Sequence, residues 1–146
     1  MEEKALLVTL NEQAASISDS VSSYLATFNG DGVLRLFESE SDKSKYAERY
    51  SAFSLKLTSA LSLLEASMAE LSKMISEYEA LGEYDKLEAL CPVFESCEEF
   101  FSVAAGFVEK NEKNFMHKAN SNPVLAFNYA RELKLALENF IKKING

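Results

Sequence analysis

The most constraining feature of the chain is a run of residues from Tyr46 to Leu81 that recurs in alternating steps of four and three. This spacing places every member on one side of an α-helix, as the a and d positions of a heptad repeat do. No Pro or Gly breaks the run, so it predicts one helix about 50 Å long, at about 1.5 Å per residue. Its members are Tyr46, Tyr50, Phe53, Leu57, Ala60, Leu64, Ser67, Leu71, Met74, Tyr78 and Leu81. A helix of this length must cover such a stripe with other parts of the chain.

The stripe is too wide for a two-stranded coiled coil. With Tyr50 at position a, the e positions hold Leu61, Met68 and Ile75, and Leu63 occupies a g position. Coiled-coil dimers normally carry charged residues at e and g, whereas a helix within a bundle needs a broader apolar face. The pattern therefore predicts a helix in a multi-helix bundle.

Three further stripes predict three more helices. Together with the long helix they cover residues 2–29, 43–81, 84–118 and 123–145. The first stripe comprises Leu7, Leu10, Ala14, Ile17, Val21, Tyr24 and Phe28. The third comprises Leu87, Leu90, Phe94, Cys97, Phe101, Ala104, Val108, Asn111 and Phe115, widened by Val93, Phe100 and Phe107. The fourth comprises Ala126, Ala130, Leu133, Leu137, Phe140 and Ile144, flanked by Phe127 and Ile141.

Gly82 marks the turn between the second and third helices. The heptad phase breaks there, and a glycine can adopt the left-handed conformation that ends a helix. A short turn makes neighbouring helices antiparallel, so we expect the third helix to run back along the second. Pro92 lies early in the third helix, and it either kinks that helix or begins a new one. The stripe continues through it without a phase change, which favours the kink.

The remaining boundaries follow from capping residues. Asn29-Gly30 is expected to end the first helix, and Asn122 before Pro123 is expected to begin the fourth. The N-cap of the long helix should be Ser39, Ser41 or Asp42. Residues 31–44 are the least regular segment, and they form either a connector that plugs the core or a binding loop.

These features together predict an all-α fold, a single antiparallel four-helix bundle domain spanning residues 1–146. The 146 residues include only two Pro and five Gly, which suits a mostly helical chain large enough to bury a core. No apolar run reaches the roughly 18 to 20 residues of a membrane span, and the N-terminus lacks a secretory signal pattern. We expect a cytoplasmic protein, with export by a route that needs no such signal as the alternative.

Net charge is −8 and is unevenly distributed. Residues 1–42 and 83–112 each carry −6, whereas residues 113–146 carry +4. An acidic surface repels phosphate backbones and anionic lipid headgroups, which argues against nucleic-acid and membrane partners. The basic last segment is most simply explained as the partner of the acidic ones within the bundle.

The sequence offers little that could carry out catalysis. Di-iron bundles need two Glu-x-x-His units, but the chain has one histidine, His117, and Asn114 lies three residues before it. Cys91 and Cys97 are 26 and 20 residues from His117 on one predicted helix, too far apart for a Cys–His pair. No glycine-rich phosphate loop is present, and the carboxylates follow the solvent face. We expect no catalytic residue, no metal site and no cofactor, and hence no enzyme.

The remaining hypotheses concern surfaces and cavities. Our first expectation is an adaptor- or chaperone-like interaction module that binds a partner helix, or self-associates as a homodimer, along the apolar flank of the second and third helices. The candidate residues are Leu61, Met68, Ile75, Phe100 and Phe107. These wide stripes could instead simply fill the bundle core. The alternatives are a carrier that holds a small apolar ligand among the phenylalanines, and, third, an elongated membrane-associated dimer.

Overall fold

Four long helices make up the computed structural model, which describes residues 2–28, 39–116 and 123–146. The first, α1 (Glu3–Leu25), continues into the 3-10 turn η1 (Ala26–Phe28). It is followed by α3 (Glu40–Leu81), α4 (Tyr84–Met116) and α5 (Pro123–Asn145). The two longest helices, α3 and α4, have 42 and 33 residues, as the lengths of their stripes predicted.

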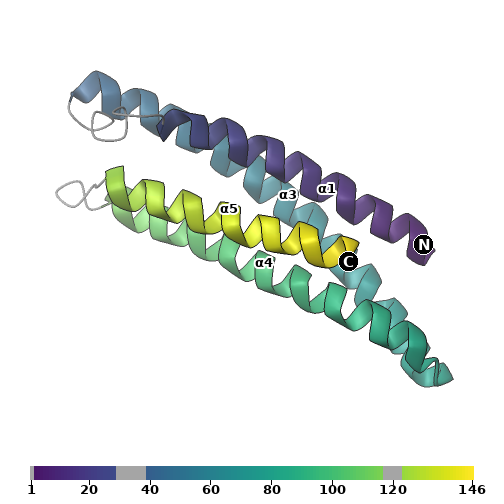
Figure 1. The fold of residues 1–146 in the computed structure, drawn as a ribbon. Coiled ribbons are helices and arrows are strands. Elements are labelled where there is room, and N and C mark those ends of the chain that lie inside the picture. Colours follow the sequence, from purple (N-terminus) through teal and green to yellow (C-terminus); the bar gives the residue numbers. More distant parts are fainter. Residues whose placement is uncertain (1, 29–38, 117–122) are drawn as a thin grey trace.

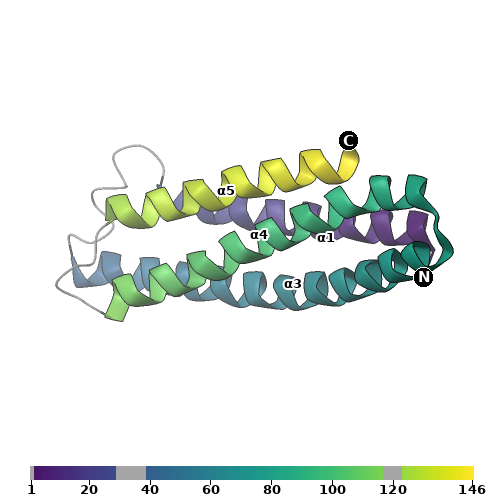
Figure 2. The same ribbon diagram turned by 90° about the horizontal axis from the view of Figure 1, so that it is seen from below.

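Successive helices run in opposite directions, and each packs against two others (Figures 1 and 2). α1 packs on α3, α3 on α4 and α4 on α5, and α5 returns to pack on α1. This arrangement confirms the predicted all-α, antiparallel four-helix bundle. The turn between α3 and α4 lies beyond the C-terminus of α5, at the end of the bundle where α1 begins (Figure 1).

The ends of α3 follow the predicted capping chemistry. Ser39 is its N-cap, and the hydroxyl oxygen accepts a hydrogen bond from the backbone N–H of Asp42 at 3.0 Å. At the other end Gly82 has a left-handed φ of 70°, and the N–H of Glu83 donates to the carbonyl of Tyr78 at 2.9 Å. These contacts satisfy backbone groups that a helix end otherwise leaves without partners.

Other predicted boundaries require correction or lie outside the described residues. The first α-helix ends at Leu25, with the 3-10 turn after it, and the long helix begins at Glu40, three residues before the predicted start. α4 continues through Pro92, so no new helix begins there. The expected stop at residues 29–30, the connector within residues 31–38 and the predicted end of the third helix at 117–118 all fall outside the described residues.

The core follows the predicted stripes closely in α1 and α5. All six predicted positions of α5 are buried, and in α1 only the first position differs, because Leu6 is buried where Leu7 was expected. α4 is rotated relative to the prediction. Its buried stripe consists of Leu90, Val93, Cys97, Phe100, Ala104, Phe107 and Asn111. The predicted core residues Phe94, Phe101 and Val108 are only half-buried, because this rotation turns Phe100 and Phe107 towards the bundle axis.

Seven aromatic rings from five elements (α1, η1, α3, α4 and α5) fill the end of the bundle where α3 begins. The ring of Tyr24 stacks on Phe53 with centroids 4.5 Å apart, and its hydroxyl lies 2.6 Å from the hydroxyl of Tyr46. The remaining rings in contact are those of Phe28, Tyr50, Phe107 and Phe127. Such edge-to-face and stacked pairs each contribute about 0.5–1.5 kcal/mol beyond their buried area. This cluster fixes α1 against α3 next to the groove described below.

Candidate functional site

The five residues predicted to bind a partner do not form an exposed surface. Phe100 and Phe107 are 1% and 3% exposed, and Leu61 is also buried. Met68 and Ile75 are half-buried and pack against the same core. In this structure these residues fill the bundle, as the core interpretation of the wide stripes allowed. A docking surface in this conformation must lie elsewhere.

The phenylalanines of α4 also leave little space for a ligand at the site where α4 meets α5. The rings of Phe100 and Phe140 stack with centroids 5.2 Å apart. The cleft beside them measures about 20 Å³, and a single water molecule needs at least about 10–15 Å³. This part of the core supplies no room for a small apolar molecule.

Two hollows on the described surface lie side by side between α1 and α3. Their volumes are about 410 and 520 Å³, and they share Ser20 and Lys56. We call them together the α1–α3 groove. Its lining residues are Ser16, Ile17, Asp19, Ser20, Ser23, Tyr24, Ala26 and Thr27 from the first part of the chain, and Arg49, Ala52, Phe53, Leu55, Lys56, Leu57, Ser59, Ala60 and Leu63 from α3.

The groove exists because small side chains face each other across two tightly packed helices. α1 contributes Ser16, Ser20 and Ser23 on the edge next to α3, and α3 contributes Ala52 and Ser59. Their side chains are too short to fill the space above the helix contact. Below them the core residues of both helices close the floor. The sequence carried a signal of this wall in the serine-rich polar face of the first helix.

Two leucines border the groove and are exposed to solvent. Leu55 is 71% exposed and Leu63 is 60% exposed, although both are large apolar residues. One end of the groove is fixed by Gln13, whose amide nitrogen donates to the carbonyl of Leu63 at 3.4 Å. The hydroxyl of Ser67 in turn donates to the amide oxygen of Gln13 at 3.1 Å. These bonds hold α1 and α3 in register at the edge of the opening.

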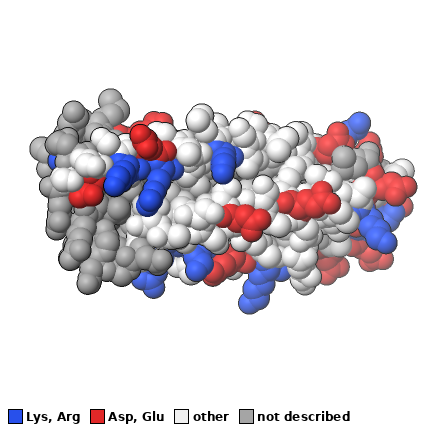
Figure 3. Space-filling model, turned by 90° about the horizontal axis from the view of Figure 1, so that it is seen from above, with Lys and Arg blue, Asp and Glu red and all other residues white. Residues whose placement is uncertain are grey.

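The charge of the groove differs from that of the whole protein. Its charged lining residues are Arg49, Lys56 and Asp19, which gives +1 on a chain of net charge −8. Neither Arg49 nor Lys56 forms an ion pair with any described residue. Figure 3 views the side of the molecule on which α1 and α3 lie, where basic side chains gather towards the start of α3 and acidic side chains lie along the middle and at the far end.

The described residues form no metal-binding cluster, and the buried Cys97 is not an activated nucleophile. Among residues 2–28, 39–116 and 123–146 no group of His, Cys, Asp or Glu side chains could hold a metal ion, and His117 lies outside these ranges. Burial raises the pKa of the Cys97 thiol to about 12, so the thiol is neutral and a poor nucleophile at pH 7. Burial likewise raises the pKa of the Tyr24 and Tyr46 hydroxyls far above their ordinary value.

Comparison with known proteins gives no relative from which a function could be transferred. No known protein family, no curated protein and no solved structure matches this chain. Within the described residues, no helix is both long and apolar enough to cross a membrane.

Proposed function

We propose that the protein is a non-enzymatic interaction module that docks an amphipathic helix in the α1–α3 groove. The observation that carries this proposal is a long hollow between two helices with Leu55 and Leu63 exposed along its edge. Proteins commonly bind helices in grooves of this kind, with anchors spaced at i, i+3, i+4 and i+7. Exposed large apolar residues gathered along one hollow are typical of such sites.

The dimensions of the groove suit a helix of about three turns. Its α1 wall extends from Ser16 to Thr27, which corresponds to about 17 Å of helix. The small side chains of the groove walls let the backbone of an incoming helix approach closely, and the two leucines supply apolar area at the edge of the groove. Covering one leucine side chain contributes about 1.5–3 kcal/mol to binding.

The local charge favours an acidic partner. Arg49 and Lys56 have no ion pair within the described structure, so acidic side chains of a bound helix can approach both without displacing an existing contact. Complementary charges of this kind mainly speed association and select the partner, and they add little affinity at an exposed rim. The bound helix can belong to another protein or to a second copy of this chain.

Site-specific photo-crosslinking tests the location of binding. A photoreactive amino acid placed at Ser20 or Ser59 should capture the bound helix, whereas the same group at Ser102, on the exposed face of α4, should not. A peptide made from the captured segment should then bind the isolated protein. Equal crosslinking from all three positions would show that the groove is not the docking site.

Substitution of the exposed leucines then tests the energetics. The pair Leu55→Ser and Leu63→Ser should weaken binding of that peptide by about 10- to 100-fold, from the burial lost. The matched control is Leu135→Ser on α5, because Leu135 is 55% exposed and lies outside the groove. Unfolding midpoints of both variants should match the unmodified protein, since exposed substitutions change stability by about 0.5 kcal/mol or less. Unchanged affinity in the leucine pair would refute the proposal.

A further inference from the structure

The edge of α3 that forms one wall of the groove carries a self-complementary charge pattern. Five residues recur there every seven positions, so they lie on one side of the helix with a drift of only about 20° per step. In chain order they are Arg49, Lys56, Leu63, Glu70 and Glu77. Leu63 is the centre, with two bases on its N-terminal side and two acids at the same distances on its C-terminal side.

This edge of α3 is accessible to a partner. Four of the five residues are exposed, and Glu70 is half-buried. None of the four charged side chains forms an ion pair with a described residue. Ala52, Ser59 and Ala66 lie between them on the same side, and Ala80 lies just after Glu77; all four are exposed and small. Small residues at these places allow another helix to approach the backbone of α3 closely.

We infer that a second copy of this chain occupies the α1–α3 groove, with the two α3 helices antiparallel and a two-fold axis at Leu63. In that arrangement Lys56 of each copy faces Glu70 of the other, and Arg49 of each copy faces Glu77 of the other. The contact would run about 42 Å along each helix. The two Leu63 side chains would cover each other at the centre. This inference rests on the proposed function and specifies its partner.

The charge pattern of this edge favours a second copy of the chain as the partner and sets the direction of its α3 helix. A two-fold interface brings the same surface together from both molecules, so a helix that is basic in one half and acidic in the other matches itself only when antiparallel. A parallel pair would place Arg49 against Arg49 and Glu77 against Glu77. An unrelated acidic helix would leave Glu70 and Glu77 facing like charge. Lys73, the other cation on this side, would lie next to the small Ala52 of the second copy and reach solvent.

The first experiment measures the mass of the intact protein in solution. Sedimentation equilibrium of the full chain at about 100 μM should give twice the monomer mass of 16.3 kDa. Salt at about 0.5 M should weaken the dimer, because it screens charges at an exposed rim. Leu63→Lys should yield a monomer, since it places two cations at the axis. Leu135→Lys, on the outside of α5, should remain dimeric, and circular dichroism should show both variants fully helical.

The second experiment exchanges the charges. The variant Arg49→Glu with Lys56→Glu carries four acids on this edge, and the variant Glu70→Lys with Glu77→Lys carries four bases. Each alone should dimerise at least about 100-fold more weakly, because every pair becomes repulsive. Mixed in equal amounts, the two should form a one-to-one heterodimer with all four pairs restored. A parallel pair would also form in the mixture, but it predicts no weakening of either variant alone, because like charges would already face each other in the unmodified protein. The loss in each variant together with the recovery in the mixture therefore supports the antiparallel arrangement.

The outcomes separate this inference from the proposed function. A monomeric protein at 100 μM, a dimer insensitive to Leu63→Lys, or charge variants that each dimerise like the unmodified protein would overturn the second copy as the occupant. If the groove positions nevertheless crosslink a helix of another protein that binds as a purified peptide, docking in the groove stands without self-association. If neither a second copy nor such a helix is captured, both proposals fail.

Discussion

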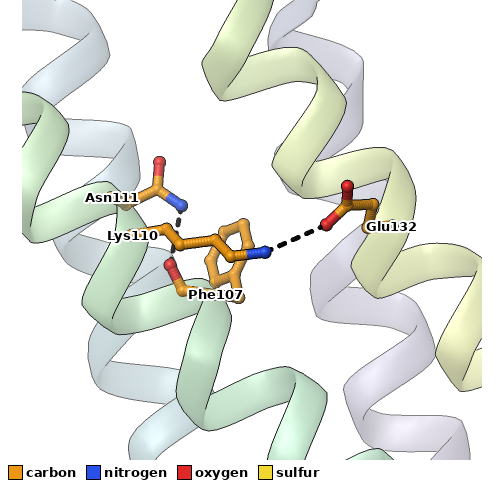
Figure 4. A network of polar contacts seen from close by, with 4 residues as sticks. All are labelled: Phe107, Lys110, Asn111 and Glu132. Atoms are coloured by element: carbon orange, nitrogen blue, oxygen red, sulfur yellow. Dashed lines mark hydrogen bonds and ion pairs between the residues drawn. The ribbon is translucent and has the colours of Figure 1, made fainter.

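Replacing Asn111 by Leu should stabilise the protein, because this amide is buried in the core stripe and one of its two polar atoms lacks a hydrogen-bond partner among the described residues. Asn111 is 0% exposed. Its side-chain nitrogen donates to the carbonyl of Phe107 at 2.9 Å, but its side-chain oxygen has no hydrogen-bond partner among the described residues (Figure 4). A buried acceptor without a partner costs about 1–3 kcal/mol, and the bond lost with the nitrogen contributes about 0.5–1.5 kcal/mol. Leucine also adds apolar burial.

The expected net gain in the free energy of unfolding is therefore about 1–2 kcal/mol for Asn111→Leu. For a chain of this length that gain corresponds to a rise in Tm of about 2–8 °C. Urea unfolding followed by circular dichroism at 222 nm, together with a thermal scan, measures both quantities. The slope of the free energy against urea should stay constant, because the surface exposed on unfolding hardly changes.

Asn145 provides a matched control for this experiment. Its side-chain nitrogen makes the same kind of bond, to the carbonyl of Ile141 at 2.8 Å, but the residue is exposed. Asn145→Leu should therefore change stability by no more than about 0.5 kcal/mol. Asn111→Asp should destabilise the protein by several kcal/mol, since it buries a charge without a partner. A loss of stability in Asn111→Leu would show that the reasoning about the unused oxygen is mistaken.

Three further predictions concern helix ends and buried acids. Gly82→Ala should lower the free energy of unfolding by about 1–2 kcal/mol, because alanine is strained at φ 70° even though a Cβ there would have room. An unchanged urea midpoint would contradict this. Ser39→Ala removes the N-cap hydrogen bond and should lower the free energy of unfolding by about 1 kcal/mol. A change below about 0.3 kcal/mol would mean that the cap is dispensable. Burial raises the pKa of Cys97, Tyr24 and Tyr46, so the native state retains protons that the unfolded chain releases. The stability contributed by these retained protons should be fully present below about pH 9, the ordinary thiol pKa, and should be lost as pH rises towards 12. Urea midpoints that stay constant between about pH 8 and 11 would rule this out.

Local patterns were sufficient to predict the helices and their direction. The unbroken run from Tyr46 to Leu81 lies within one helix, and Gly82 turns the chain in the left-handed conformation expected of it. In α5 each predicted core position is buried, because its apolar stripe is narrow and permits only one orientation. These features depend on residues close together in the chain, so they can be predicted from the sequence alone.

The rotation of α4 could not be predicted in this way. Its apolar surface is wide, so the stripe through Phe94 and Phe101 and the one through Phe100 and Phe107 were both compatible with the heptad spacing. The structure selects the second stripe by the way α4 packs between α3 and α5. That choice removed Phe100 and Phe107 from the candidate surface. Leu81, at the C-terminal end of α3, is 71% exposed although its stripe predicted it in the core.

By itself, the sequence determined that this chain forms four antiparallel amphipathic helices, because periodicity, capping residues and a single glycine turn act through neighbouring residues. Only the tertiary structure decided which apolar residues are covered and where a groove opens. The groove requires Ser20 of one helix to lie beside Lys56 of another, 36 positions later in the chain. The packing of all four helices fixes that juxtaposition, since each helix can rotate about its own axis until its neighbours hold it in place.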